Sequence, residues 1–148
     1  MKTIYITCAI IFIILGIESC SNSKTLQSSD LQNIVFQATL NSASATPSNT
    51  SKATGKAQFT YNPNTYILTG TVSFQGMTPT DAHIHQGAVG VSGITVFGLA
   101  TGTITSPFSY TSPALTATQQ ADLLANLYYI NLHSIAYPDG EIRGQLVH

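Results

Sequence analysis

The chain has 148 residues, of which only 7% are charged, and its formal net charge at pH 7 is −1. This length allows one domain, and a hydrophobic content of 43% is enough to build a packed core. Without clustered Lys and Arg, the chain lacks the surface that nucleic acids require and the basic patch that binds anionic membranes.

The start of the chain has the pattern of a bacterial lipoprotein signal. A basic first turn precedes an apolar run at 4–17, which predicts a secretory signal peptide and is shorter than a membrane-spanning helix. The run ends in residues 16–20, which resemble a lipobox, although Glu18 stands where a small or hydroxyl residue is usual. We therefore predict a lipoprotein signal peptide at 1–19 and lipidation of Cys20. The alternative is a plain signal peptide that leaves Cys20 as a free thiol.

The predicted lipid would hold the domain at a membrane. Residues 20–32 are polar and predict a lipidated cysteine followed by a flexible tether. We expect the domain at the outer membrane of a bacterial cell envelope, facing the periplasm or the exterior. Cys8 lies inside the signal and Cys20 at its end, so the mature domain has no internal thiol. This excludes a disulfide framework and a cysteine-based catalytic or metal site.

The first half of the domain alternates apolar and polar residues with the period of a β-strand. Alternation at 33–40 predicts a half-buried strand, and a loop rich in Ser, Thr and Pro follows at 41–51. Alternation returns at 52–61 and at 65–74, on either side of an Asn-Pro-Asn turn. Two alternating segments joined by a tight turn predict a β-hairpin.

The second half predicts further strands and one helix. Short apolar runs bounded by turn residues predict strands at 94–100, 103–110, 128–135 and 141–147. A helix with a leucine stripe is predicted at 115–127, because Thr116 and Gln119 have the spacing of a capping box. Together these elements predict an all-β fold, an antiparallel sandwich or barrel with one short helix.

Residues 81–87, Asp-Ala-His-Ile-His-Gln-Gly, hold the clearest signal for chemistry. If this segment is a strand, His83 and His85 project from one face, and Ala82 and Ile84 project from the other. Two imidazoles on one face are close enough to share a metal ion or an anion, although a metal site needs a third ligand. The alternative is that both histidines are structural and bond to neighbouring carbonyls.

Three segments together resemble the CHRD domain, which is repeated in chordin and occurs singly in many bacterial secreted proteins. They are Phe36-x-Ala38-x-Leu40, Ala82-His83-Ile84-His85-Gln86-Gly87, and an ending that joins Tyr129-Ile130-Asn131-Leu132-His133 to Pro138-Asp139-Gly140-Glu141-Ile142-Arg143-Gly144-Gln145-Leu146. The resemblance assigns 33–148 to a CHRD-like domain. It implies an antiparallel immunoglobulin-like or superoxide-dismutase-like β-sandwich. The role of animal chordin as an antagonist of bone morphogenetic proteins does not carry over, and single-domain bacterial members offer no established activity.

His133 is the candidate third ligand. If its strand lies beside 81–87, three imidazoles converge, which suits copper or zinc and leaves a fourth position open. The motif His83-x-His85 also resembles the copper-ligand strand of Cu/Zn superoxide dismutase. Because the chain has no counterpart of that enzyme's full ligand set, we do not expect dismutase activity. Asp81 is a candidate to bond the backbone beside the histidines or to orient an imidazole.

Glu141 and Arg143 lie two residues apart and share a strand face. We expect a structural role for both, either as an ion pair or through bonds from Arg143 to loop carbonyls that hold the closing strand. No catalytic residue is predicted.

Two functions remain open on these grounds. The first is a non-enzymatic, envelope-anchored binding or structural module for an unknown protein or glycan ligand. The second is a metal-binding protein in which His83, His85 and His133 hold copper or zinc, with copper favoured and no cofactor certain. An enzyme with an unrecognised site ranks below both.

Overall fold

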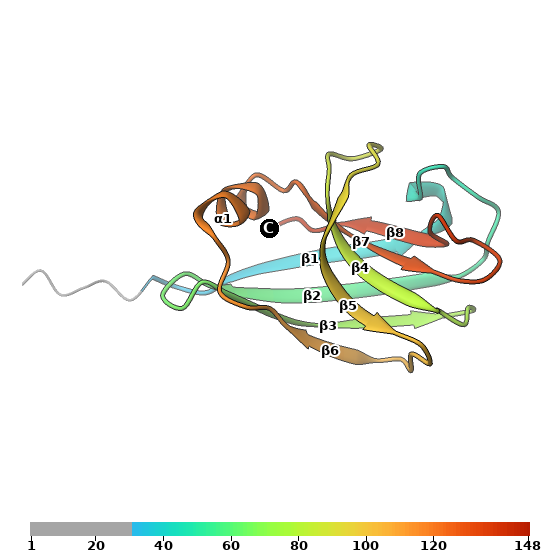
Figure 1. Cartoon of the computed structure of the whole chain (residues 1–148), viewed down its shortest axis with the longest axis horizontal. Coiled ribbons are helices and arrows are strands. Elements are labelled where there is room, and N and C mark those ends of the chain that lie inside the picture. The colour runs from blue at the N-terminus through green and yellow to red at the C-terminus, as the bar shows by residue number, and fades with distance from the viewer. Residues whose placement is uncertain (1–30) are drawn as a thin grey trace, which may run out of the picture.

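The computed structural model describes residues 31–148 as one antiparallel sheet of eight strands. The strands are β1 (Ile34–Asn41), β2 (Thr54–Asn62), β3 (Ile67–Gln75), β4 (Asp81–Gln86), β5 (Ile94–Thr101), β6 (Phe108–Thr111), β7 (Tyr128–His133) and β8 (Ile142–Gln145). A 3-10 turn, η1 (Ser42–Ser44), follows β1, and one short helix, α1 (Ala117–Leu124), connects β6 to β7 (Figure 1).

The sheet has the strand order β5-β4-β7-β8-β1-β2-β3-β6 and curls until it nearly closes. Strands β4 and β5 therefore cross over β1, β2 and β3 (Figure 1). The two edge strands approach each other, since the rings of Phe97 on β5 and Tyr110 on β6 have centroids 6.2 Å apart. The predicted all-β antiparallel fold with one short helix is confirmed, and a single folded sheet supplies both layers of the sandwich.

The core fills the space between the two layers. Its fully buried members come from both layers and from the helix: Phe36, Leu40, Phe59, Leu68, Val72, Ala82, Ile84, Leu123, Ile130, Leu132, Ile142 and Leu146. Because side chains alternate along a strand, the residues between these core positions point outward. On β4 and β7 those outward positions carry the histidines.

The predicted hairpin is confirmed as β2 and β3, and most of the alternating residues are buried or half-buried. The second strand begins at Ile67 and not at 65, because Tyr66 lies in the turn with φ 62 and is exposed. At its centre Phe59 lies opposite Gly70, and a Cβ at Gly70 would overlap the Phe59 ring. Glycine at this position lets the aromatic ring lie against the partner strand. In the connecting turn, the side chain of Asn62 accepts a hydrogen bond from the backbone N–H of Asn64, at 2.9 Å.

The helix begins where the capping box predicts. The Thr116 hydroxyl accepts from the Gln119 N–H, and the Gln119 side chain accepts from the Thr116 N–H. The helix is shorter than predicted, because Asn126 adopts a left-handed conformation with φ 57 and ends it. Of its leucines only Leu123 is buried, whereas Leu124 is exposed, so the predicted apolar stripe is a single contact.

Three predicted strands are shorter in the structure. The strand expected at 103–110 begins only at Phe108, because Pro107 has no N–H to donate to the ladder. The strand expected at 128–135 ends at His133, and the closing strand is restricted to β8. Val147, beyond β8, still pairs with Gln37 on β1 as an isolated bridge.

The predictions for the start of the chain fall on residues 1–30. The signal peptide at 1–19, Cys8, the lipidation of Cys20 and most of the tether at 20–32 lie outside the described residues. Within residues 31–148, no helix has the length and apolarity needed to cross a membrane.

Candidate metal centre

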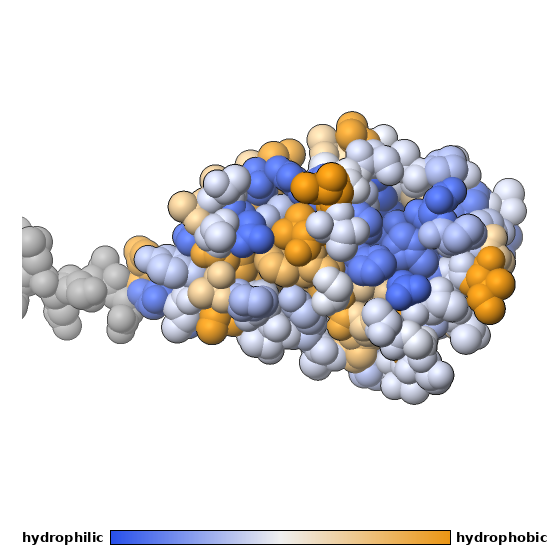
Figure 2. All heavy atoms as spheres, viewed as in Figure 1, coloured by the Kyte–Doolittle hydropathy of each residue, from blue (hydrophilic) through white to orange (hydrophobic). Residues whose placement is uncertain are grey.

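The candidate site lies on the outward face of two neighbouring strands, β4 and β7. His83 and His85 point outward from β4, while Ala82 and Ile84, which alternate with them, are fully buried in the core. This confirms the predicted division of the two faces. Figure 2 shows strongly hydrophilic residues gathered over the part of the surface where β4 and β7 lie.

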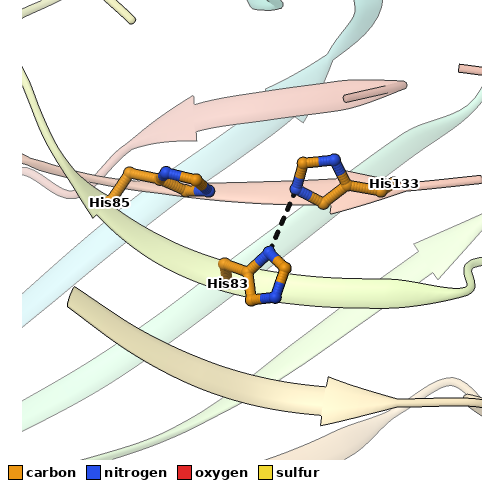
Figure 3. Close-up of side chains that lie close together, drawn as sticks. All are labelled: His83, His85 and His133. Atoms are coloured by element: carbon orange, nitrogen blue, oxygen red, sulfur yellow. Dashed lines mark hydrogen bonds between the residues drawn. The ribbon is translucent and has the colours of Figure 1, made fainter. Parts of the chain in front are cut away.

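The sheet brings His133 to the other two histidines, as the sequence predicted. One ligand nitrogen from each ring lies within 4.8 Å of the others, and His85 is buried while His83 and His133 are half-buried. His83 Nδ1 is 3.2 Å from His133 Nε2, and the centroids of the His83 and His85 rings are 5.6 Å apart (Figure 3). A tetrahedral zinc or copper ion holds its nitrogen ligands about 3.3 Å apart, so small ring rotations bring all three within reach.

Backbone carbonyls fix the tautomers of two of these rings. His85 Nδ1 donates to the Gly93 carbonyl at 3.1 Å, and His133 Nδ1 donates to the Pro138 carbonyl at 2.8 Å. A carbonyl can only accept, so the proton sits on Nδ1 of each ring. The Nε2 of His85 therefore carries a free lone pair, whereas the Nε2 of His133 accepts a hydrogen bond from His83 Nδ1, which a metal ion bound between the rings would replace. This is the arrangement that metal-binding histidines usually have.

His85 Nε2 is buried and has no hydrogen-bond partner within the described chain. A buried polar atom left unpaired costs about 1–3 kcal/mol, so native proteins usually supply a partner. Because this nitrogen carries a lone pair and lies in the histidine cluster, a metal ion is a partner that fits the site.

The local environment keeps two of the rings neutral. Burial lowers the pKa of His83, the neighbouring His133 lowers it further, and the charge of Asp81 opposes both. Burial also lowers the pKa of His85, against the opposing bond to the Gly93 carbonyl. The other histidines and Arg143 add smaller effects in the lowering direction. Neutral imidazole is the form that binds a metal ion.

A column of three side chains runs along the same face across β4, β7 and β8. The rings of His85 and Tyr129 are stacked, with centroids 5.1 Å apart and planes within 7° of parallel. The guanidinium carbon of Arg143 lies 3.5 Å from the centroid of the Tyr129 ring. Because β7 lies between β4 and β8 in the sheet, Tyr129 occupies the middle of the column.

Arg143 bonds to loop carbonyls and not to Glu141, which is the second of the two arrangements expected from the sequence. It donates to the carbonyls of Val91 and Ala88 and to the Thr46 hydroxyl, at 3.0, 2.8 and 2.9 Å. Glu141 instead accepts a hydrogen bond from the Ser51 hydroxyl at 2.6 Å. The two residues are therefore not paired with each other. Both hold the loop between β1 and β2 against the sheet, and Arg143 also holds the loop that follows β4.

Asp81 makes a smaller contribution than the sequence suggested. Its carboxylate is not part of the ligand cluster found in residues 31–148, which consists of the three histidines alone. The rings of His85 and His133 are oriented by carbonyls and not by this carboxylate. Asp81 acts on the site through its charge, which raises the pKa of His83.

Tyr129 was not predicted as a site residue, although period-two alternation along β7 from His133 places it on the face of the histidines. Two irregularities in the pairing with the neighbouring strand β5 were also not predicted. The register between β4 and β5 shifts on either side of His83 and Ile84, so that Gly98 lies opposite His83 and Thr95 opposite His85. A Cβ at Gly98 would have nothing within 4 Å, which leaves the side of His83 that faces β5 open.

Fold and site together define a class of protein: an antiparallel β-sandwich with three converging histidines on the outward face of one layer. The family model described as CHRD domain matches residues 36–146, so this chain belongs to the CHRD domain family. No curated protein and no solved structure matches the chain. The matched range contains all eight strands except the first two residues of β1, and all three histidines.

Proposed function

We propose that this CHRD domain is a non-enzymatic binding module whose ligand is a single copper or zinc ion held by His83, His85 and His133. The observation that carries the proposal is the convergence of three imidazole nitrogens within 4.8 Å of one another. Copper is favoured over zinc, and three neutral ligands leave a further position for water.

The alternative, that the histidines only support the fold, explains the site less well. A structural histidine usually finds partners for both ring nitrogens, as buried polar groups generally do. His85 satisfies Nδ1 with the Gly93 carbonyl and leaves Nε2 buried without a partner in the described chain. The two fixed tautomers also direct the Nε2 lone pairs of His85 and His133 into the cluster, where a cation would take the place of the hydrogen bond from His83 to His133.

A metal count tests this proposal. The chain from Ser21 onward, produced without a histidine tag and incubated with copper or zinc, should retain about one ion per chain after desalting. The double variant His83→Ala/His85→Ala should retain none, while His148→Ala, which removes a histidine outside the cluster, should retain the ion. Circular dichroism of each variant establishes that it is folded. No bound metal in the folded unsubstituted chain would refute the proposal.

A second candidate ligand is a neutral glycan, on the opposite layer of the sandwich. The outward face of β1, β2 and β3 forms an open hollow of about 700 Å³ lined by amides and hydroxyls, among them Gln37, Gln58, Thr71 and Ser73. Such groups form hydrogen bonds with sugar hydroxyls. Titration with neutral oligosaccharides tests this candidate, and Gln58→Ala should weaken any binding without changing the metal count.

We also propose that the domain is anchored as a lipoprotein at the outer membrane of a bacterial cell envelope. The support is the sequence pattern at 1–20, with Cys20 as the lipidated residue. The full chain expressed in a bacterium should partition into the detergent phase, and Cys20→Ser should move it to the aqueous phase. Equal partitioning of both forms would contradict the anchor.

A further inference from the structure

We propose, on the basis of the metal site above, that Arg143 acts through Tyr129 to make the site selective for monovalent copper, Cu(I), over Cu(II) and Zn(II). Arg143 is a positioning residue in this proposal, because it touches Tyr129 and the loop carbonyls but not the ion.

The column connects Arg143 to the metal ligand His85 through direct contacts. Arg143 and Tyr129 are each 2% exposed and His85 is 9% exposed, so little water enters between them. The guanidinium lies on the Tyr129 ring, and that ring is stacked on His85. Tyr129 is also held in place by its hydroxyl, which accepts a hydrogen bond from the Gly93 N–H at 3.0 Å. Gly93 in turn orients His85 through its carbonyl.

Arg143 also carries a positive charge that its hydrogen-bond partners do not neutralise. A guanidinium stays protonated at every accessible pH. Its hydrogen bonds go to two backbone carbonyls, a hydroxyl and the side-chain amide oxygen of Gln145, all of them neutral. The nearby carboxylate of Glu141 bonds to Ser51 instead. A buried positive charge repels a divalent ion twice as strongly as a monovalent one at the same distance. It therefore favours the lower charge on the metal.

The ligands of the site also favour Cu(I). The cluster contains three neutral imidazoles, and no carboxylate or thiolate of the described chain belongs to it. Zinc would need a water molecule as its fourth ligand here, and Cu(II) prefers a tetragonal arrangement of nitrogen and oxygen. Three neutral nitrogens are enough for Cu(I), a d¹⁰ ion with no need for anionic ligands. Asp81 is the nearby negative charge, but it is only partly buried, so water screens it more than it screens Arg143.

The size of the effect follows from Coulomb's law. A unit charge roughly 10 Å from the ion, in a medium of effective dielectric constant about 20, changes the ratio of Cu(I) to Cu(II) affinity by about tenfold. For a one-electron couple, tenfold corresponds to about 59 mV.

The experiment separates the effect of the positive charge of Arg143 from the effect of its side-chain contacts. Arg143→Met removes the charge and keeps a long side chain, whereas Arg143→Lys keeps the charge and loses the planar fork. Thr46→Asp leaves Arg143 in place and puts a carboxylate where its hydroxyl partner was, so it neutralises the charge without removing the loop anchor. The affinities for Cu(I), Cu(II) and Zn(II) are measured by competition with chromophoric chelators, and the copper midpoint potential by redox titration.

We expect the unsubstituted chain to bind Cu(I) more tightly than Cu(II) and Zn(II). The Cu(I)/Cu(II) affinity ratio and the midpoint potential should fall in Arg143→Met and in Thr46→Asp, by about tenfold in the ratio. Arg143→Lys should stay near the unsubstituted chain. Tighter binding of Zn(II) or Cu(II) by the unsubstituted chain would overturn the selectivity, and an unchanged ratio in Thr46→Asp would overturn the role of the charge. Failure to bind any of the three ions would instead refute the proposed function.

Discussion

The two layers of the sandwich both present polar outward faces, but only one of them is covered. On β1, β2 and β3 the outward residues, such as Gln37, Lys56 and Thr71, are exposed. On β7 and β8 the outward residues Tyr129, Asn131 and Arg143 are buried, and the loops that follow β1 and β4 bond to Arg143, which is only 2% exposed. Both faces arise from the same period-two alternation.

The difference shows how covering a polar face creates a defined site. An exposed amide or hydroxyl is satisfied by water and is free to rotate. A buried polar group must find a partner within the protein, so its position becomes fixed. On the covered face this requirement sets the tautomers of His85 and His133 and the column that ends at Arg143.

The largest expected effect comes from removing Arg143, which holds the loops that follow β1 and β4 against the outward face of β7 and β8. Arg143→Ala removes a buried side chain together with its hydrogen bonds to the Ala88 and Val91 carbonyls and the Thr46 hydroxyl, and it should lower the free energy of unfolding by about 3 kcal/mol. Lys56→Ala, on the exposed face, should change it by less than about 0.5 kcal/mol. Urea denaturation of the metal-free proteins measures both. Equal losses in the two variants would mean that the covered face is no more constrained than the open one.

Metal binding should make the covered face more stable still. At a free copper concentration 100 times the Kd, binding to the folded state alone adds about 2.7 kcal/mol to the free energy of unfolding. Thermal unfolding with copper, and again after a chelator is added, should show a reversible rise in Tm. The rise should vanish in His83→Ala/His85→Ala and persist in Gln58→Ala. A rise of the same size in the double variant would place the ion elsewhere.

Tyr129→Phe keeps the aromatic ring in the middle of the column and removes only its hydroxyl. The variant keeps the stack on His85 but leaves the Gly93 N–H without its partner, which should cost about 1 kcal/mol of unfolding free energy. Faster amide exchange at Gly93, measured by NMR, should accompany the loss. Unchanged exchange there would show that the hydroxyl does not hold the loop.

The smallest effect is a pH dependence of the metal-free protein. Burial lowers the pKa of His83 and His85, so below about pH 6.5 the unfolded chain binds more protons than the folded one. The free energy of unfolding should therefore fall as the pH drops from 7 through 6.5 to the lowered values. Replacing both histidines by Gln should flatten the curve. A curve that rises on acidification would contradict the burial of neutral rings.

Local sequence patterns were sufficient to predict the hairpin, the capped helix and the common face of His83 and His85. The convergence of His133 could be stated only as a condition, because it depends on β7 lying beside β4, a pairing between distant segments. The bulges that place Gly98 beside His83 were not predicted, since they break the alternation on which strand prediction rests. The burial of Arg143 depends on two loops whose paths no local pattern defines.

The near closure of the sheet has a consequence for how copies of this chain meet one another. An edge strand presents a row of backbone groups to which a strand from another molecule can add. Here the two edges, β5 and β6, curl toward each other until Phe97 and Tyr110 make contact. A strand approaching either edge is obstructed by the other, and Pro107 precedes the shorter edge. The curvature that encloses the core thus also hinders the addition of strands from other molecules to the edges of the sheet.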